Sequence, residues 1–131
     1  PNSRSAHTYF AENFAVLAES DRLRLVDEGF DVTPEVTVRH TGGHTRGHQL
    51  VELNGSRDRA VHFGDLMPTH AHANPLWIMA YDDFPLDVIS AKQQLVAHYG
   101  DRWFTFYHDA HMVACKRDEN GKIGGSQIGY F

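Results

Sequence analysis

The sequence predicts an α/β fold in which helices cover one face of a mixed sheet. Short runs of alternating or continuous apolar residues indicate strands, and helical periodicity occurs before and between them. The chain has 131 residues, of which 41% are hydrophobic and 22% are charged. This length and composition are typical of one globular domain. No internal repeat, linker or low-complexity segment divides the chain.

The first third of the chain carries one helical pattern and two strand patterns. Apolar residues at helical spacing predict a helix over Thr8–Glu19. Leucines that alternate with arginines predict a short strand over Arg22–Val26, which ends in a turn at 27–29. Val36 and Val38 alternate with polar residues, so a strand is expected there too. This strand leads directly into a loop that is rich in histidine and glycine.

The remaining elements follow from apolar runs and from turn residues. A helix is expected from Pro85 through His98, because proline suits the first turn and one face is apolar. The segment between Asp65 and Asp83 is loop-like, and its apolar run 76–79 is either a pocket wall or lid, or buried core. We expect four further strands, at 49–53, 60–63, 103–107 and 112–116. An edge strand is also expected in the tail.

Charge and composition exclude several classes of partner and site. The formal net charge is −5 and no cluster of lysine and arginine offsets it, which argues against nucleic acid as a partner. No run approaches the roughly 20 apolar residues that span a bilayer, so no membrane is expected. The single cysteine, Cys115, excludes a disulfide within the chain and a cysteine-rich zinc site. The chain begins at Pro1 and shows no signal peptide, and we expect a cytoplasmic location.

Three positions share one topological feature that favours metal binding. His44, Asp65 and His108 each follow or flank a predicted strand at a loop position. Ligands of α/β proteins gather where strands end at one edge of the sheet. Imidazole nitrogen and carboxylate oxygen bind zinc at about 2.0–2.2 Å, and a carboxylate can bridge two ions. We therefore expect these three side chains to converge.

Three segments in this order resemble a known family. The segments are 41–48 (TGGHTRGH), 63–69 (FGDLMPT) and 106–109 (FYHD). In order and rough spacing they are similar to the second half of a metallo-β-lactamase-fold hydrolase, and most similar to its lactonase-like branch. The resemblance covers nearly all of the chain. It implies the carboxy-terminal half of an αβ/βα sandwich, with a mixed sheet and helices on one face.

The resemblance also implies roles for individual residues. His44 would complete a first metal site, His108 would complete a second, and Asp65 would bridge both metals and take part in catalysis. His48 would support the site without binding a metal. Two zinc ions are expected in the complete site, with manganese or iron as alternatives. Arg46 replaces the common proline of the family, which changes the loop surface and leaves the ligand untouched.

The family's H-x-H-x-D-H motif is absent from this sequence. That motif lies in the first half of the fold and supplies most of the metal ligands. We therefore expect residues 1–131 to be a single partial domain that lacks its amino-terminal half. Its expected partners are a small-molecule substrate and either the missing half or further copies of the chain. On its own, such a fragment is expected to bind metal weakly and to be inactive.

Further residues are candidates for the substrate pocket or for supporting roles. His70 and His72 are interpreted as pocket or supporting groups, or else as histidines of an exposed loop. Asp109 is expected to orient its loop or a ligand imidazole. Tyr81 and Asp82 either line the pocket or belong to a run that caps the following helix.

The implied activity of the full-length parent is hydrolysis. Two bound cations would activate a water molecule and polarise the carbonyl of a lactone, ester or similar substrate. Two alternatives remain open at this point. One is a thioester hydrolase of the glyoxalase II kind, and the other is a non-catalytic binding or assembly module with a degenerate site.

Overall fold

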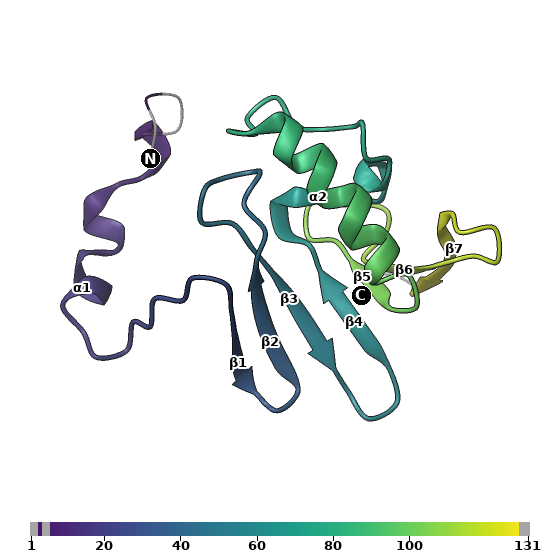
Figure 1. Ribbon diagram of the computed structural model, residues 1–131, viewed down its shortest axis with the longest axis horizontal. Coiled ribbons are helices and arrows are strands. Elements are labelled where there is room, and N and C mark those ends of the chain that lie inside the picture. Colours follow the sequence, from purple (N-terminus) through teal and green to yellow (C-terminus); the bar gives the residue numbers. More distant parts are fainter. Residues whose placement is uncertain (1–2, 4–5, 129–131) are drawn as a thin grey trace.

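One mixed sheet forms the centre of the molecule. The computed structural model describes residues 3 and 6–128. Seven strands lie in sequence order across the sheet, and only the neighbours β4 and β5 run parallel (Figure 1). The strands are β1 (Gly29–Thr33), β2 (Val36–His40), β3 (Gln49–Asn54), β4 (Arg59–His62), β5 (Trp103–Thr105), β6 (Ala114–Arg117) and β7 (Ile123–Ile128). This architecture confirms the predicted α/β fold with a mixed sheet.

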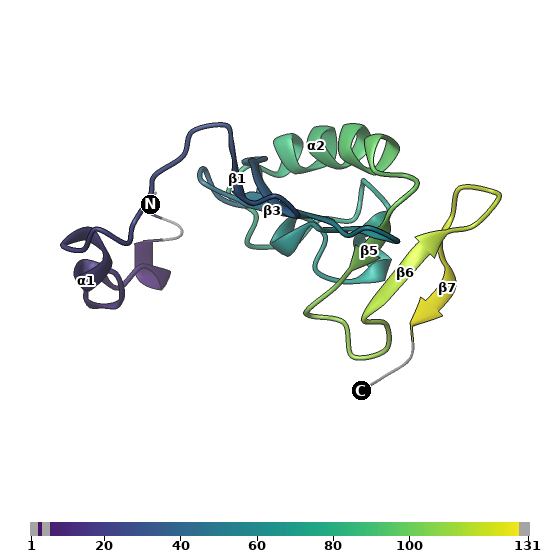
Figure 2. The same ribbon diagram turned by 90° about the horizontal axis from the view of Figure 1, so that it is seen from below.

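One long helix, α2 (Pro85–His98), lies against one face of the sheet (Figure 2). Proline occupies its first turn, where its fixed φ suits the helix and its missing N–H would have no partner. The predicted helix therefore has the bounds that the sequence indicated. The helix carries the chain across the sheet from β4 to β5, which is the connection that parallel strands require. The shorter helices are η1 (Ala6–Thr8), η2 (Ala11–Asn13), α1 (Ala15–Ala18), η3 (Gly64–Leu66) and η4 (His70–Ala73).

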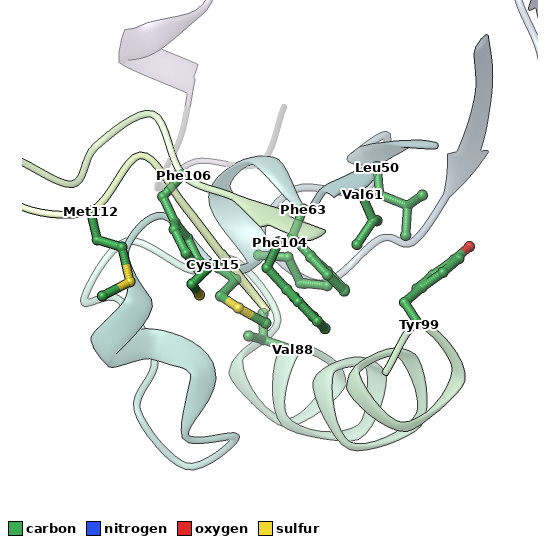
Figure 3. Close-up of a cluster of buried hydrophobic side chains, with 11 residues drawn as sticks. Leu50, Val61, Phe63, Val88, Tyr99, Phe104, Phe106, Met112 and Cys115 are labelled. Atoms are coloured by element: carbon green, nitrogen blue, oxygen red, sulfur yellow. The ribbon is translucent and has the colours of Figure 1, made fainter. Parts of the chain in front are cut away.

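The core lies between α2 and the sheet. Alternate residues of β3, β4 and β5 point towards the helix, as expected from the period of a strand. Figure 3 shows these side chains meeting those of the helix, with the rings of Phe63 and Phe104 stacked at a centroid distance of 5.4 Å. The buried cluster consists of Leu50, Val61, Phe63, Leu66, Met67, Val88, Tyr99, Phe104, Phe106, Met112 and Cys115.

The opposite face of the sheet is also apolar over β2 and β3. Val38 pairs with Val51, and Val36 pairs with Leu53, so all four side chains lie on the face away from Leu50. The three valines are partly exposed, and 39% of the Leu53 surface is accessible. In contrast, Leu50 on the helix side is fully buried. The sheet therefore packs well on one side only.

Two predictions for the amino-terminal segment were wrong. The helix expected over Thr8–Glu19 is divided into η1, η2 and α1, each of three or four residues. The strand expected over Arg22–Val26 does not form, and Leu25 is 85% exposed. The apolar residues of this segment do not pack against the sheet, because the segment extends away from it (Figure 1). A short isolated helix is marginal in water, and a strand needs a partner.

Other boundaries differ by a few residues. The sequence did not indicate β1, whose glycine and aspartate have low strand propensity; it forms by pairing with β2. The strand expected at 103–107 ends at Thr105, and the strand expected at 112–116 lies at Ala114–Arg117, because the chain between β5 and β6 forms a loop. No helix within the described part of the chain is long and apolar enough to cross a membrane.

Candidate metal centre

His44 lies on a tight loop between β2 and β3. Gly42 and Gly43 have positive φ values of 63° and 81°, a conformation that glycine adopts without steric cost. The loop is joined to the start of α2 by backbone hydrogen bonds: the Asp83 N–H donates to the His44 carbonyl at 2.9 Å, and the Phe84 N–H to that of Gly43 at 3.0 Å. The loop is therefore held at both its strand ends and its tip.

The His44 side chain is oriented by a buried carboxylate. Its Nδ1 lies 2.8 Å from Oδ1 of Asp82, which is 2% exposed. This bond raises the pKa of His44 above its usual value, although partial burial acts in the opposite direction. With Nδ1 engaged, Nε2 is directed at Asp65, whose Oδ2 lies 3.4 Å away. A ring oriented in this way presents its second nitrogen to an ion.

Asp65 lies between two imidazoles. It follows β4 in η3, and its Oδ1 lies 3.4 Å from Nε2 of His108, while its Oδ2 faces His44. The hydroxyl of Tyr107 also donates a hydrogen bond to Oδ1. Burial and this bond raise the pKa of Tyr107 above its usual value, so the phenol stays protonated and remains a donor. Each oxygen of one carboxylate thus faces a different histidine.

His108 reaches the site from the opposite side, after β5. Its N–H donates to the carbonyl of Pro68 at 3.3 Å, and its ring lies 4.0 Å from that of Tyr107. The side chain is 56% exposed, compared with 16% for His44. The structure therefore brings together His44, Asp65 and His108, the three residues that the sequence singled out.

His48 lies behind the centre and does not reach Asp65. Its Nδ1 is 2.5 Å from the Thr41 hydroxyl, and its ring centroid is 5.8 Å from that of His44. Burial, together with the nearby His44, lowers the pKa of His48 to about 4, so its imidazole is neutral at pH 7. A neutral ring at this position packs the loop without adding charge to the site.

A cavity of about 670 Å³ opens directly over the three residues. The segment that follows η4 forms part of the wall, and Thr69 and His72 also line the cavity. The lining residues are His44, Asp65, Pro68, Thr69, His72, Ile78, Met79, Ala80, Tyr81 and His108. His72 and Tyr81 therefore line the cavity, and the apolar run 76–79 contributes to its wall. A pocket of this size suits a small molecule with an apolar part.

His70 and Asp109 join two loops beside the cavity. Oδ2 of Asp109 accepts a hydrogen bond from the His70 N–H at 2.9 Å and lies 2.5 Å from its Nδ1. Oδ1 accepts from the N–H groups of His111 and Met112 at 2.9 Å and 3.0 Å. Asp109 therefore fixes the loop that presents His108, and neither Asp109 nor His70 lines the cavity.

The interpretation of Asp82 as a helix cap was wrong. The residue before α2 is Phe84, which makes no side-chain capping bond. Asp82 instead binds His44, and its Oδ2 accepts a hydrogen bond from the Met79 N–H at 2.8 Å. Sequence reasoning also missed the role of Tyr107 beside Asp65. A tyrosine within an aromatic strand pattern carries no local signal of a partner 42 residues away.

The donor set fits part of a metal centre. Two Nε2 atoms and two carboxylate oxygens face a common space, and this combination of nitrogen and oxygen suits zinc. Across the residues that the structure describes, no group of three histidine, cysteine, aspartate or glutamate side chains converges closely enough to enclose an ion. The arrangement therefore offers nitrogen and oxygen ligands but does not by itself complete the coordination sphere of an ion.

Comparison with solved structures places this geometry in a known fold. A probable metal-dependent hydrolase from Staphylococcus aureus matches the whole chain with 36% identity and a TM-score of 0.88. A hydrolase of the β-lactamase superfamily, AbOPH, matches 92% of the chain with 18% identity and a TM-score of 0.66. The chain has a metallo-β-lactamase fold. AidC, a dizinc quorum-quenching lactonase, matches 83% of the chain with 13% identity and a TM-score of 0.66.

The match to this metallo-β-lactamase fold covers a limited part of each solved structure. The chain spans 48% of the Staphylococcus aureus hydrolase, 43% of AbOPH and 40% of AidC. No protein-family model and no curated protein matches the sequence.

Proposed function

We propose that the protein is a metal-dependent hydrolase that acts on a lactone, ester or similar carbonyl compound. In this proposal His44 and His108 would each help to hold one of two metal ions, and Asp65 would contribute a ligand to both. Two of the matched structures are a probable metal-dependent hydrolase and a dizinc lactonase, which supports the reaction class and zinc. The substrate is a small molecule that occupies the cavity above these residues.

The position of Asp65 carries the proposal. Each of its two oxygens lies 3.4 Å from the Nε2 of a different imidazole. A tetrahedral zinc ion with ligand atoms at about 2.1 Å holds neighbouring ligand atoms about 3.4 Å apart. Both spacings therefore suit a nitrogen and an oxygen that share an ion. An ordinary hydrogen bond between the same atoms would be shorter, at about 2.9 Å.

The residues of the chain have separate tasks in the proposed reaction. Bound divalent cations would lower the pKa of a coordinated water towards neutrality and polarise a carbonyl group. Asp82 holds the His44 ring so that Nε2 is available, and Tyr107 holds the Asp65 carboxylate by a bond to Oδ1. The wall at 78–81 shields one side of the cavity from water.

Zinc binding by the purified protein tests the proposal. We expect Asp65→Asn to remove most of the binding measured by isothermal titration calorimetry, because the change takes one charged ligand from both ions. His7→Ala is the matched control, since His7 is exposed and lies in η1, outside the sheet. Equal zinc affinity in Asp65→Asn and in the unaltered protein would contradict the proposal.

A non-catalytic binding module is the second candidate function, because the ligand set among the described residues is incomplete. Because three ligand groups cannot fill two coordination spheres, the chain alone is expected to bind zinc weakly and to show little activity. Tight, stoichiometric zinc on this chain would instead point to a self-sufficient site. Parallel assays of a lactone, an ester and a thioester with a longer, metal-loaded version of the protein that supplies the remaining ligands distinguish lactonase-like from glyoxalase II-like hydrolysis. The absence of turnover on all three would favour a non-catalytic binding module.

A further inference from the structure

A buried cation lies in α2 and is used by neither the candidate metal centre nor an ion pair. Lys92 has no accessible surface. The ion pairs found among the described residues do not include it. Burial of an ammonium group is costly unless hydrogen bonds replace its water. The surroundings of Lys92 must therefore supply those bonds.

Three backbone carbonyls of one segment surround the ammonium. Nζ of Lys92 donates to the carbonyls of His72, Asn74 and Trp77 at 2.9, 3.1 and 2.5 Å. A protonated lysine has three N–H donors, so donors and acceptors match one to one. The segment has little regular structure after η4, so its carbonyls do not take part in the backbone hydrogen bonds that a sheet would provide. One side chain of α2 thus fixes the path of the segment.

The same segment continues as the wall of the cavity. His72, Ile78, Met79 and Ala80 all line the cavity. A second attachment follows within two residues of Trp77, where the Met79 N–H donates to Asp82 at 2.8 Å. Asp82 in turn binds His44. The wall is therefore held by Lys92 at one end and through Asp82 to the candidate metal centre at the other.

We propose that Lys92 is a positioning residue that holds the segment 72–79 in place and so sets the width of the cavity above the metal centre. The role in substrate binding rests on the proposed hydrolase function. The role in fixing the wall does not, because it depends only on the contacts of α2 with the segment. Lys92 does not line the cavity and acts through the backbone carbonyls of the wall.

Lys92→Met tests the proposal, because methionine keeps the apolar stem and removes all three donors. Loss of buried charge-assisted bonds is expected to speed amide hydrogen exchange in the segment 70–81 by about tenfold or more, while β3 keeps its protection. Lys116→Met is the matched control, since Lys116 pairs with Asp58 and packs over Trp103, and neither contact involves the segment. Unchanged exchange at 70–81 in Lys92→Met would overturn the proposal.

Two further measurements separate positioning from a general role in folding. Lys92→Gln retains two N–H donors and is expected to show intermediate exchange in the segment. If both variants lose the fold altogether, Lys92 serves the helix core and the proposal fails. In a longer, metal-loaded version of the protein that supplies the remaining ligands, we expect KM for the hydrolysed substrate to rise more than kcat falls, with zinc affinity unchanged. If no substrate or zinc is bound at all, the hydrolase function fails and hydrogen exchange still decides the role of Lys92.

Discussion

At the scale of single residues, the site is defined by the partners of its carboxylates. Asp82 uses one oxygen for His44 and the other for the Met79 N–H, so it fixes a side chain and the backbone together. Asp65 divides its oxygens between His44 and His108. These pairings leave Nε2 of each imidazole directed at Asp65. Small displacements of the backbone near Asp65 would therefore disturb both histidines.

A substitution at Gly64 is expected to displace the backbone next to Asp65. Its φ is 56°, and a Cβ atom there would lie 2.9 Å from Nε2 of His48. We expect Gly64→Ala to reduce the free energy of unfolding by about 1–2 kcal/mol from backbone strain alone, with a further loss from the contact. Urea denaturation measures the change, and zinc titration shows whether Asp65 has moved.

Gly47→Ala is the control for this prediction. It lies in the same loop region as His48, but a Cβ atom added there would meet nothing within 4 Å. Its φ is not in the left-handed region. The expected change is within about 0.5 kcal/mol. Equal effects of the two substitutions would show that the close approach of Gly64 to His48 does not matter.

The residues of the centre could be chosen from the sequence because their chemistry is unusual at strand ends. His44, Asp65 and His108 each stand out as ligand-type side chains at a loop position. Lys92 and Tyr107 could not be chosen in this way. A lysine in a helix and a tyrosine in an aromatic strand have ordinary local patterns, and only long-range contacts reveal their partners.

At the scale of elements, a polar cluster joins α2 to the sheet. Glu52 on β3 is 5% exposed and accepts a 2.7 Å hydrogen bond from the Tyr99 hydroxyl at the end of α2. Arg39 on β2 also donates to it, and Arg102 lies within 3.6 Å. Burial alone would raise the pKa of Glu52, but these partners outweigh burial and hold the pKa below its usual value.

Tyr99→Phe removes one of these bonds and is expected to lower the free energy of unfolding by about 1–3 kcal/mol. The effect also depends on pH. Because the pKa of Glu52 is lower in the folded protein, its contribution is present above the unfolded pKa and is lost as pH falls through the folded one. Loss of the Tyr99 bond raises the folded pKa, so acid unfolding followed by circular dichroism should begin at a higher pH.

Tyr9→Phe is the control, because Tyr9 is 41% exposed in the amino-terminal segment and is not part of the cluster. Its acid transition is expected to match that of the unaltered protein. If Tyr99→Phe also unfolds at the same pH as the unaltered protein, the hydrogen bond to Glu52 contributes nothing to acid stability.

The elements that could be predicted are those whose pattern and packing agree. Helix α2 has proline at its start and buries Val88, so its bounds follow from the sequence. The pattern at Arg22–Val26 looked equally regular, but no strand among the described residues pairs with it. Conversely, β1 has a poor pattern and exists because β2 offers a free edge. Tertiary contacts decided both cases against local propensity.

At the scale of the whole molecule, two apolar surfaces have no cover within the described chain. One is the face of β2 and β3 around Val38 and Leu53. The other is the amino-terminal segment, in which Tyr9, Phe10, Phe14, Val16, Leu17, Leu23 and Leu25 are each at least 41% exposed. Exposed apolar patches of this kind favour association. The surfaces suit either an additional segment of the same protein or a second copy.

We expect the chain to associate at high concentration, and Leu53→Gln to reduce that association. Leu53 is 39% exposed on the face away from the core, so its replacement should cost little stability. Leu86→Gln is the control, since Leu86 is 78% exposed on α2, on the other side of the sheet. Sedimentation velocity measures the distribution of species. A monodisperse monomer of the unaltered chain at high concentration would contradict this prediction.

The parallel pairing of β4 with β5 affects the order in which parts of the chain fold. His44 and Asp65 flank the antiparallel strands β3 and β4, and these can pair as soon as a short turn has closed. His108 arrives only after residues 63–102 have crossed the sheet to seat β5. Contacts between distant parts of a chain form late because closing the intervening loop costs entropy. A ribosome-bound intermediate would thus hold His44 and Asp65 in place before His108 joins them.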